Sequence, residues 1–316
     1  LKDRIPSSPA FVVDVTGLIK ALQALSSLRV ASGCKLLYSI KALPLLAVLE
    51  IIKPYVDGFS VSSLFEARLA HEVLAGKGSV HLTTPGIRQD EIAELATLCS
   101  HISCNTINQF RRLTQNAQDK ASLGLRINPK LSFTDDVRHD PCRQHSKLGV
   151  AIDEPFIPEF PNNIKGIHFH TVYSQTDFAP LVQTVGKLRQ LISDNLATLE
   201  WLNLGGGYLY DQMMDKAGFV DLIRQLKTEF AGDIFIEPGN AVVGKAAYLL
   251  ATVIDCFESD GKAVAVLDAS VNHLPQVFEY QRQPEVYGHE PDGDFLVILA
   301  GSTCLAGDLF GEYRFK

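Results

Sequence analysis

The feature of this sequence that most constrains its fold is a strand-then-helix rhythm that repeats along most of the chain. Short apolar segments of strand length alternate with longer segments whose apolar residues recur at helical spacing. The segments with strand character are 35–40, 56–62, 79–84, 101–104, 122–128, 164–171, 199–207 and 233–239. Strands that alternate with helices form parallel sheets, so this α/β pattern predicts an eight-stranded (β/α) barrel of the TIM type.

The rhythm changes after residue 245, where strands follow one another without intervening helices. The segments with strand character in this part are 246–259, 261–270 and 293–301. We therefore expect a C-terminal, mostly antiparallel β domain, which the first residues of the chain can join. The expected division is residues 15–245 for the barrel, and residues 1–14 together with 246–316 for the β domain.

The composition argues against several classes of protein. The 316 residues carry a net charge of −7 with no Lys/Arg-rich block, which argues against nucleic acid as a partner. No apolar run reaches transmembrane length and no leader pattern begins the sequence, so we expect no membrane association and a cytoplasmic location. Six scattered cysteines without a CxxC pair indicate reduced thiols rather than a disulfide framework or a zinc site.

Polar and glycine residues follow several of the predicted strands, where the active site of such a barrel is built. They include Lys41, Arg126, His170, Gly205–Gly207 and Glu237–Gly239. Lys41 by itself most simply marks the point where the chain reaches water. The functional alternative is a Schiff-base lysine, because partial burial lowers the pKa of an ammonium group and frees the amine to condense with an aldehyde.

Two of these positions suit the two ends of a phosphorylated pyridine ring. Backbone N–H groups of Gly205–Gly207 can approach a phosphate, although a tight turn between strand and helix would need the same residues. The Glu237 carboxylate could keep a pyridine nitrogen protonated, or could form an ordinary cap or salt bridge.

His168 and His170 alternate on one strand and so share a face. No further ligands complete a metal set, so we expect no metal, and one histidine suits the face of a flat cofactor.

Together these segments resemble the fold-type III pyridoxal-phosphate (PLP) decarboxylases, the alanine-racemase-like group. The resemblance covers nearly the whole chain, with the segments in the expected order. It implies PLP as the cofactor, held by Lys41 within the segment Tyr38–Ala42. The other cofactor-binding residues that it implies are Arg126, His170, Gly205, Gly206, Gly207, Glu237, Gly239 and Asn240.

Within this group, the chain is most similar to the carboxynorspermidine (carboxyspermidine) decarboxylases. The segments that carry this similarity are Ser39–Ala42, His168–Thr171, Leu267–His273 and Thr303–Asp308. Departures from the other decarboxylases agree with it. Those enzymes generally have an HVGS-like stretch where this chain has Thr171–Tyr173, an acidic residue at the position of Leu305, and in many cases an arginine at the position of Asn240.

This resemblance implies decarboxylation of carboxynorspermidine or carboxyspermidine to norspermidine or spermidine, in polyamine biosynthesis. The catalytic residues would be Lys41 and Cys304, with the cysteine donating a proton in the active site of the neighbouring subunit. We therefore expect a homodimer with shared active sites and a polyamine-like amino acid as the small-molecule substrate. The implied substrate-binding residues are Glu66, Ser270, His273 and Asp308, with Asp308 the first candidate for a distal amine.

Two alternatives stay open at this point. The substrate could be another basic amino acid, namely diaminopimelate, ornithine or arginine. The chain could also be a non-catalytic PLP-binding protein, although such proteins are typically a barrel without the extra β domain and without the partner-subunit cysteine. The polar loop at 130–147 either closes over the site or is a plain solvated loop.

Overall fold

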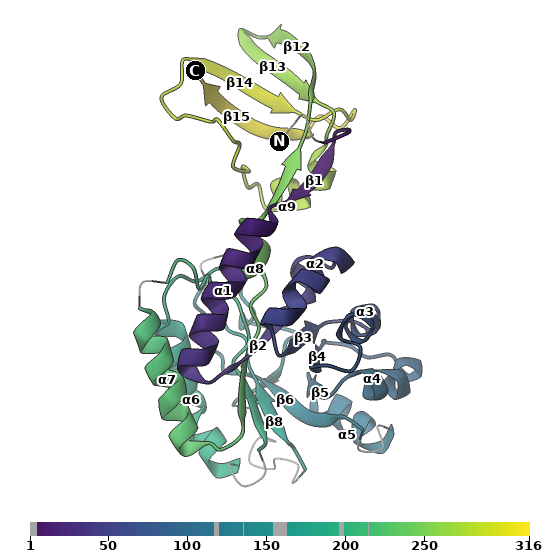
Figure 1. Ribbon diagram of the computed structural model, residues 1–316, viewed down its shortest axis with the longest axis vertical. Helices are drawn as coiled ribbons and strands as arrows, with labels where there is room; N and C mark the ends of the chain where they lie inside the picture. Colours follow the sequence, from purple (N-terminus) through teal and green to yellow (C-terminus); the bar gives the residue numbers. More distant parts are fainter. Residues whose placement is uncertain (1–4, 117–119, 135, 154–162, 196–198, 214) are drawn as a thin grey trace. The chain divides into compact units, whose positions relative to one another are not determined.

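The computed structural model describes residues 5–116, 120–134, 136–153, 163–195, 199–213 and 215–316. The chain forms two compact units, one made of Val15–Ala246 and the other of Leu1–Asp14 together with Ala247–Lys316 (Figure 1). Within the described ranges, no helix has both the length and the apolar character that crossing a membrane requires.

The larger unit is a closed barrel of eight parallel strands, so the predicted TIM-type barrel is confirmed. The strand order is β5-β4-β3-β2-β10-β9-β8-β6, and the pairing of β5 with β6 closes the ring. The barrel strands are β2 (Lys35–Ser39), β3 (Gly58–Val61), β4 (Ser79–Thr83), β5 (His101–Cys104), β6 (Ser122–Asn128), β8 (Gly166–His168), β9 (Trp201–Asn203) and β10 (Asp233–Ile236). The two-residue strand β7 (Val150–Ala151) pairs with the last residues of β6.

Helices follow the strands and lie outside the sheet (Figure 1). They are α1 (Val15–Ser32), α2 (Leu46–Ile52), α3 (Leu64–Leu74), α4 (Ile92–Leu98), α5 (Ile107–Asn116), α6 (Ala179–Asn195), α7 (Lys216–Glu229) and α8 (Asn240–Val243). The start of α3 shows how local sequence determines them: the Ser63 hydroxyl accepts a hydrogen bond from the Glu66 N–H at 3.2 Å. Buried residues then recur at helical spacing, at Ala67, Ala70 and Leu74.

The strand register determines which side chains meet at the C-terminal end of the barrel. Arg126 on β6 is paired with His168 on β8, and His168 is paired with Asn203 on β9. Asn203 is paired in turn with Phe235 on β10, two residues before Glu237. Laterally paired residues of a sheet point to the same face, so Arg126, His168 and Asn203 form one row, and all three are buried.

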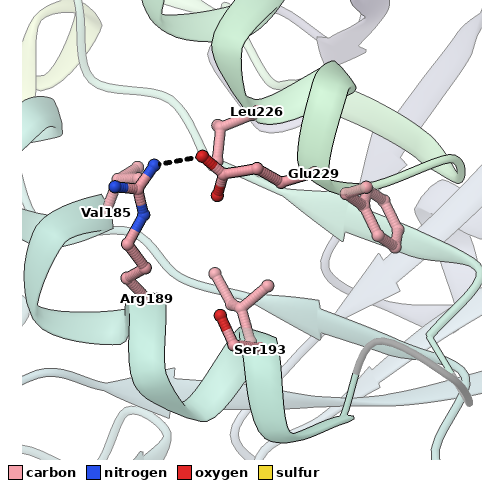
Figure 2. Close-up of a pocket in the computed structure, with 7 residues that line it drawn as sticks. Val185, Arg189, Ser193, Leu226 and Glu229 are labelled. Carbon is pink, nitrogen blue, oxygen red and sulfur yellow. Dashed lines mark hydrogen bonds and ion pairs between the residues drawn. The ribbon is translucent and has the colours of Figure 1, made fainter.

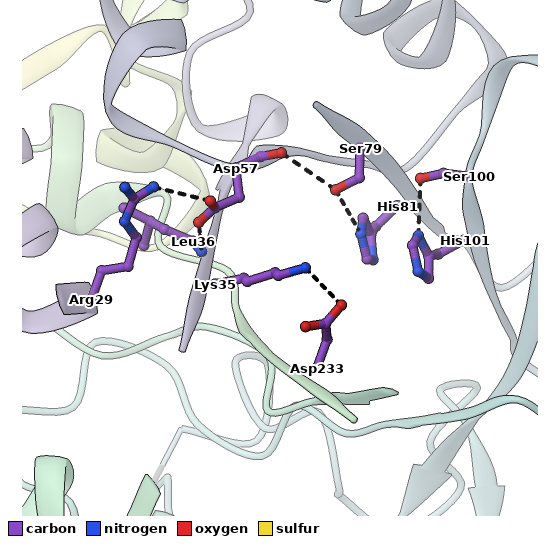
Figure 3. A network of polar contacts seen from close by, with 9 residues as sticks. All are labelled: Arg29, Lys35, Leu36, Asp57, Ser79, His81, Ser100, His101 and Asp233. Carbon is purple, nitrogen blue, oxygen red and sulfur yellow. Dashed lines mark hydrogen bonds and ion pairs between the residues drawn. The ribbon is translucent and has the colours of Figure 1, made fainter. Parts of the chain in front are cut away.

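The N-terminal end of the barrel is closed by stacked rings and polar contacts (Figure 3). The imidazoles of His81 and His101 stack with ring centroids 4.0 Å apart and planes 7° apart. Each is hydrogen bonded to a serine, with 3.0 Å between His81 Nε2 and Ser79 Oγ and 2.9 Å between His101 Nδ1 and Ser100 Oγ. These contacts leave the N-terminal end filled by the chain's own side chains.

A large buried indole fills the space beside these histidines. Trp201 is 1% exposed, and its Nε1 donates a hydrogen bond to Ser122 Oγ at 2.9 Å. The neighbouring strands make room for it with Gly124 and Gly166, because a Cβ added to Gly166 would come within 2.0 Å of the Trp201 ring. The glycines on β6 and β8 are therefore required by packing.

The smaller unit contains two sheets. A two-stranded antiparallel sheet pairs β1 (Ala10–Val13) with β11 (Ala247–Leu250). The second sheet has the order β12-β13-β14-β15, formed by β12 (Val253–Ser259), β13 (Lys262–Leu267), β14 (Phe295–Ala300) and β15 (Leu309–Phe315). Only β13 and β14 pair in parallel, so the prediction of a mostly antiparallel β domain is confirmed. The short helix α9 (Pro275–Glu279) packs with the turn Val271–His273.

Two details of this unit differ from the sequence prediction. The single strand predicted at 246–259 is divided into β11 and β12 at residue 252, where the Thr252 N–H donates to Asp268 Oδ1 at 2.8 Å instead of continuing a ladder. Strand β15 was not predicted, because Gly311, which has a φ of 135°, interrupts the pattern of β-forming residues.

Candidate active site

Lys41 lies just beyond β2, in a 3-10 turn formed by Ile40–Ala42. Strands β2 and β10 are neighbours, and the Ser39 N–H donates to the Pro238 carbonyl at 3.0 Å. A Cβ added to Gly239 would lie 3.1 Å from the Ala42 Cβ, so the missing side chain at Gly239 lets the two segments approach closely. The folded chain thereby brings Lys41 and Glu237 to the same end of the barrel.

The Lys41 side chain is exposed, whereas the sequence argument expected it to be partly buried. The reason is that the short turn after β2 carries the side chain past the last buried residue of the strand. Across the described parts of the chain, the Lys41 amine has no hydrogen bond or ion pair. The amine is therefore available to a ligand at this end of the barrel.

The glycine triplet Gly205–Gly207 forms the turn after β9, with φ values of 69° at Gly205 and 91° at Gly207. Gly205 N–H donates to Asn203 Oδ1 at 2.9 Å, and Gly206 N–H donates to His170 Nδ1 at 3.1 Å. A Cβ added to Gly206 would lie 2.1 Å from the Glu237 carbonyl oxygen. The triplet therefore serves a close approach of two backbone segments, and its role in binding a phosphate stays a prediction.

The sequence predicted that His168 and His170 share one face of a strand. This prediction is wrong, because β8 ends at His168 and His170 lies two residues beyond it. The last ladder bond between β8 and β9 runs from the Phe169 N–H to the Asn203 carbonyl, and His170 beyond it instead accepts the Gly206 N–H. Burial, together with the charges of Lys41 and Arg126, lowers the pKa of His170 to about 3. His170 is therefore a neutral imidazole whose Nδ1 accepts the Gly206 N–H.

Glu237 is a buried carboxylate held by its neighbours. Asn203 Nδ2 donates to Glu237 Oε1 at 2.9 Å, and His168 Nε2 lies 3.4 Å from Oε2. Burial by itself raises the pKa of Glu237, but His168 and the Asn203 amide outweigh it, and the pKa lies well below its ordinary value. Burial lowers the pKa of His168, and the Glu237 charge opposes that shift, so the two groups are electrostatically coupled.

Arg126 supplies a second cation at this end of the barrel. Its side chain is 9% exposed, and burial lowers its pKa while the Glu237 charge opposes that shift. In the ranges that the structure covers, the guanidinium makes no hydrogen bond. A buried arginine without a bonded anion is costly, which makes Arg126 and Lys41 together a site for an anionic ligand.

The other predicted residues of the barrel have contacts of their own. Glu66 accepts hydrogen bonds from the Ser62 N–H at 2.6 Å and the Ser62 hydroxyl at 3.0 Å, so its carboxylate supports the start of α3. Gly239 is the residue before α8, and Asn240 is exposed at the first position of that four-residue helix. The roles of these residues in binding cofactor or substrate stay predictions.

The predicted residues of the smaller unit gather around Asp308. Asp308 Oδ1 accepts hydrogen bonds from the Ser270 hydroxyl at 3.1 Å and the Val271 N–H at 2.8 Å. Asp308 Oδ2 accepts from the Thr303 N–H at 3.1 Å and the Thr303 hydroxyl at 2.5 Å. The carboxylate thus fastens the loop that carries Cys304 to the turn that begins at Ser270. Cys304 and His273 are both exposed.

His168 and Asn203 are neighbours of Glu237 that were not predicted as site residues. His168 entered only in a possible metal pair and in the segment His168–Thr171, and Asn203 was not singled out. The available signal was position, because each is the last residue of a barrel strand. Among the described side chains, no group of three or more His, Cys, Asp or Glu residues is arranged to bind a metal ion.

A crevice in the outer helical layer lies between α6 and α7 (Figure 2). Arg189 and Glu229 form an ion pair across it, with 2.6 Å between Arg189 Nη2 and Glu229 Oε1. The residues that line the crevice are Val185, Arg189, Ile192, Ser193, Leu226, Glu229 and Phe230. All of them belong to helices or the residue after one, so the crevice is separate from the strand ends that carry Lys41 and Glu237.

The arrangement at the C-terminal end of the barrel fits PLP. Lys41 offers an amine for an aldehyde, and Arg126 offers a charge for a phosphate or carboxylate. Glu237 offers an ionised carboxylate for a pyridine nitrogen. His168 is 1% exposed, and its two ring nitrogens have no hydrogen-bond partner among the described residues, so the row contains polar groups that the protein alone does not satisfy.

Comparisons with known proteins agree with this description. Residues 18–244 match the family described as pyridoxal-dependent decarboxylase, pyridoxal binding domain. Over 324 residues the chain is 30% identical to carboxynorspermidine/carboxyspermidine decarboxylase of Campylobacter jejuni, covering 98% of this chain and 83% of that protein. It is 33% identical to carboxyaminopropylagmatine decarboxylase of Synechocystis over 314 residues, covering 98% of this chain and 80% of that protein.

A solved structure is similar over almost the whole chain. It is carboxynorspermidine decarboxylase from Campylobacter jejuni in complex with norspermidine, which superposes with a TM-score of 0.85 at 28% sequence identity. The superposition covers 98% of this chain and 84% of that one. The likeness therefore extends to the smaller unit as well as to the barrel.

Proposed function

Because the chain belongs to the pyridoxal-dependent decarboxylase family, we propose that it removes CO₂ from carboxynorspermidine or carboxyspermidine and releases norspermidine or spermidine. The observation that carries the proposal is the set of groups at one end of the barrel: Lys41 and Arg126, which have no hydrogen bond to the described residues, and the Glu237 carboxylate, whose pKa is lowered. The relatives with similar sequences over 98% of this chain supply the substrate class.

The residues divide the work of binding and orientation. PLP, when bound, supplies an electron sink for the electron pair that remains after CO₂ leaves. Lys41 provides the amine that attaches the cofactor, and Glu237 keeps a proton on the pyridine nitrogen. Arg126 and Gly205–Gly207 would hold the phosphate, with Gly239 and Asn240 as further contacts, and His170 would lie against the ring. These assignments are the ones that the contacts around Glu237 and the glycine triplet support.

The substrate is tested by kcat/KM for a panel of carboxylated polyamines and basic amino acids. The panel contains carboxynorspermidine, carboxyspermidine, carboxyaminopropylagmatine, diaminopimelate, ornithine and arginine. Carboxyaminopropylagmatine is included because the Synechocystis relative has the higher identity of the two. We expect one of the first two compounds to have the highest kcat/KM. A preference for diaminopimelate, ornithine or arginine would contradict the proposal, and no turnover of any compound would favour a non-catalytic PLP-binding protein.

Cys304 is proposed as a proton donor that acts in the active site of the partner subunit of a homodimer. Its thiol is exposed on a loop and is not part of a disulfide, so it is available to another chain. The test mixes two inactive variants, Lys41→Ala and Cys304→Ala. If sites are shared, half of randomly mixed dimers carry one intact site, and activity recovers to about a quarter of the wild-type rate. No recovery, despite confirmed subunit exchange, would contradict shared sites.

Contacts to the distal amines of the substrate are proposed at Glu66, Ser270, His273 and Asp308. Each candidate already has a bond inside the chain: Ser270 with Asp308, His273 with the Ser270 N–H, and Glu66 with Ser62. Asp308→Asn distinguishes the two roles of that carboxylate. Loss of an amine contact raises KM and weakens inhibition by norspermidine, whereas loss of the loop contacts changes the rate at which Cys304 reacts with a thiol reagent.

A cytoplasmic location is part of the same proposal, and it agrees with six cysteines that form no disulfide. Cell fractionation tests it: the protein should be recovered with cytoplasmic markers. Recovery with the membrane or an extracytoplasmic fraction would contradict it.

A further inference from the structure

We propose that Asn203 is a positioning residue that couples the glycine triplet to Glu237 and, with His168 beside the second carboxylate oxygen, holds that carboxylate towards the pyridine nitrogen of PLP. The proposal rests on PLP binding and on the assignment of Glu237, and not on the identity of the substrate.

The Asn203 amide can face Glu237 in only one way. Its side chain is fully buried, and its Oδ1 accepts the Gly205 N–H at 2.9 Å. The Nδ2 group must then point the other way, where it donates to Glu237 Oε1 at 2.9 Å. A flipped amide would place donor against donor at Gly205 and acceptor against acceptor at Glu237. The backbone of the glycine triplet therefore sets the orientation of the group that holds Glu237.

The same backbone segment contacts Glu237 directly. The Glu237 N–H donates to the Gly205 carbonyl at 2.8 Å, and no side chain could be accommodated at Gly206, since its Cβ would lie 2.1 Å from the Glu237 carbonyl. The triplet and Glu237 are thus joined twice, through backbone and through Asn203. Because the triplet and Glu237 are assigned to opposite ends of the cofactor, Asn203 links the two ends of one binding site.

His168 occupies the other side of the carboxylate. Its Nε2 lies 3.4 Å from Glu237 Oε2, and it is paired across the sheet with Asn203. Other titratable or charged groups also act in this region. Glu237 interacts electrostatically with four of them: Arg126 from β6, His81 from β4, His170 after β8 and Tyr210 after β9. The charge of Lys41 acts on His168 and His170. Asn203 is the neutral donor bonded to Glu237, so it can be altered without changing the net charge.

The test compares two cofactors in their binding to the apo protein. PLP has a ring nitrogen, whereas its 1-deaza analogue has a C–H group at that position and cannot interact with Glu237 in the same way. The ratio of the two dissociation constants therefore measures the contribution of the ring nitrogen without requiring turnover. We expect the wild-type protein to prefer PLP, and Glu237→Gln to lose most of that preference.

Asn203→Ala should reduce the preference for PLP about tenfold, the size expected for losing one hydrogen bond to a charged group. His168→Leu should reduce it about threefold, because 3.4 Å is a weaker contact. The matched control is Asn105→Ala. Asn105 is also buried after a barrel strand, but its amide bonds only to backbone, to the Lys147 carbonyl at 2.8 Å and the Gly149 N–H at 2.7 Å. Its loss should leave the ratio unchanged.

A purely structural role for Asn203 has a different signature. If Asn203 only shapes the glycine triplet, Asn203→Ala weakens both cofactors equally and the ratio stays at its wild-type value, which overturns the proposal. If Asn203→Ala does not fold, the ratio for His168→Leu decides, and an unchanged ratio there overturns the proposal equally. Because no substrate is used, failure of the polyamine assignment would leave this outcome intact.

Discussion

The two ends of the barrel use charge in opposite ways, and neighbouring strands β2 and β10 show this most clearly. At the N-terminal end, Lys35 and Asp233 bond to each other, with 2.7 Å between Lys35 Nζ and Asp233 Oδ2 (Figure 3). At the C-terminal end, Lys41 follows β2 and Glu237 follows β10, but no ion pair between them is present in the described structure. Glu237 is held instead by Asn203 and faced by His168.

This difference separates a charge used for structure from a charge kept for a ligand. The Lys35–Asp233 pair is about half exposed, and such pairs contribute little to stability. A Lys41–Glu237 pair would have occupied both of the groups that are proposed to bind the cofactor. The structure avoids it by bonding Glu237 to the neutral Asn203 amide, which stabilises the carboxylate without pairing it with Lys41.

The largest effect is expected from the two lysines at the ends of β2. Lys41→Ala should lower the decarboxylation rate by about a thousandfold or more, because the amine that is proposed to attach the cofactor is lost. Lys35→Ala should keep the rate within about twofold, since only a half-exposed ion pair is lost. Initial rates and the visible absorbance of bound PLP check both. Near-normal turnover by Lys41→Ala would contradict the mechanism.

The acids at the ends of β10 form the second comparison. Glu237→Gln should lower the rate by about a hundredfold, because an amide cannot keep the pyridine nitrogen protonated. Asp233→Asn should have a rate close to that of the wild-type protein. Both variants should bind PLP, which absorbance titration verifies. Equal losses from the two substitutions would mean that the contrast between the barrel ends is wrong.

The histidines at the N-terminal end predict an acid-sensitive barrel. Burial lowers the pKa of His81 well below its ordinary value and that of His101 to about 4. An unfolded histidine titrates near pH 6.5, so below that pH the unfolded chain binds protons that the folded chain does not. The free energy of unfolding should therefore fall as the pH is lowered from about 6.5 towards 4, by about 1–3 kcal/mol for His101.

Urea denaturation of the apo protein at pH 7.5 and pH 5 measures this loss. His101→Gln should lose less free energy of unfolding than the wild-type protein, because it lacks the buried imidazole of His101. The carboxylates, His168 and His170 titrate in both proteins, so their contributions cancel in the comparison. If the two proteins lose the same stability between these pH values, His101 does not contribute as described.

The smallest effect concerns the Lys35–Asp233 pair itself. A double-mutant cycle with Lys35→Ala and Asp233→Ala should give a coupling energy of about 0.2–1 kcal/mol, which falls with added salt. Thermal or urea unfolding measures it. A coupling energy of several kcal/mol would show that this end of the barrel depends on its charges more than their exposure suggests.

Much of the barrel and several site residues could be predicted because the relevant signals are local. Apolar runs of strand length mark the strands, and in a parallel barrel all strands point the same way, so the residues that follow them meet at one end. Position after a strand made Lys41, His170, Gly205–Gly207 and Glu237 candidates for the site, and their roles stay predictions. Strand β15 was missed because Gly311 interrupts its local pattern.

The sequence by itself thus determined the strand-and-helix order, the residues after each strand and the family. Only the tertiary structure decided how neighbouring strands are offset, and that offset pairs Arg126 with His168 and His168 with Asn203. It also decided that Asp308 bonds within its own unit and that Lys41 is exposed. The physical reason is that register and side-chain contacts depend on residues far apart in the chain, as in the 34-residue separation between Asn203 and Glu237, which no local pattern records.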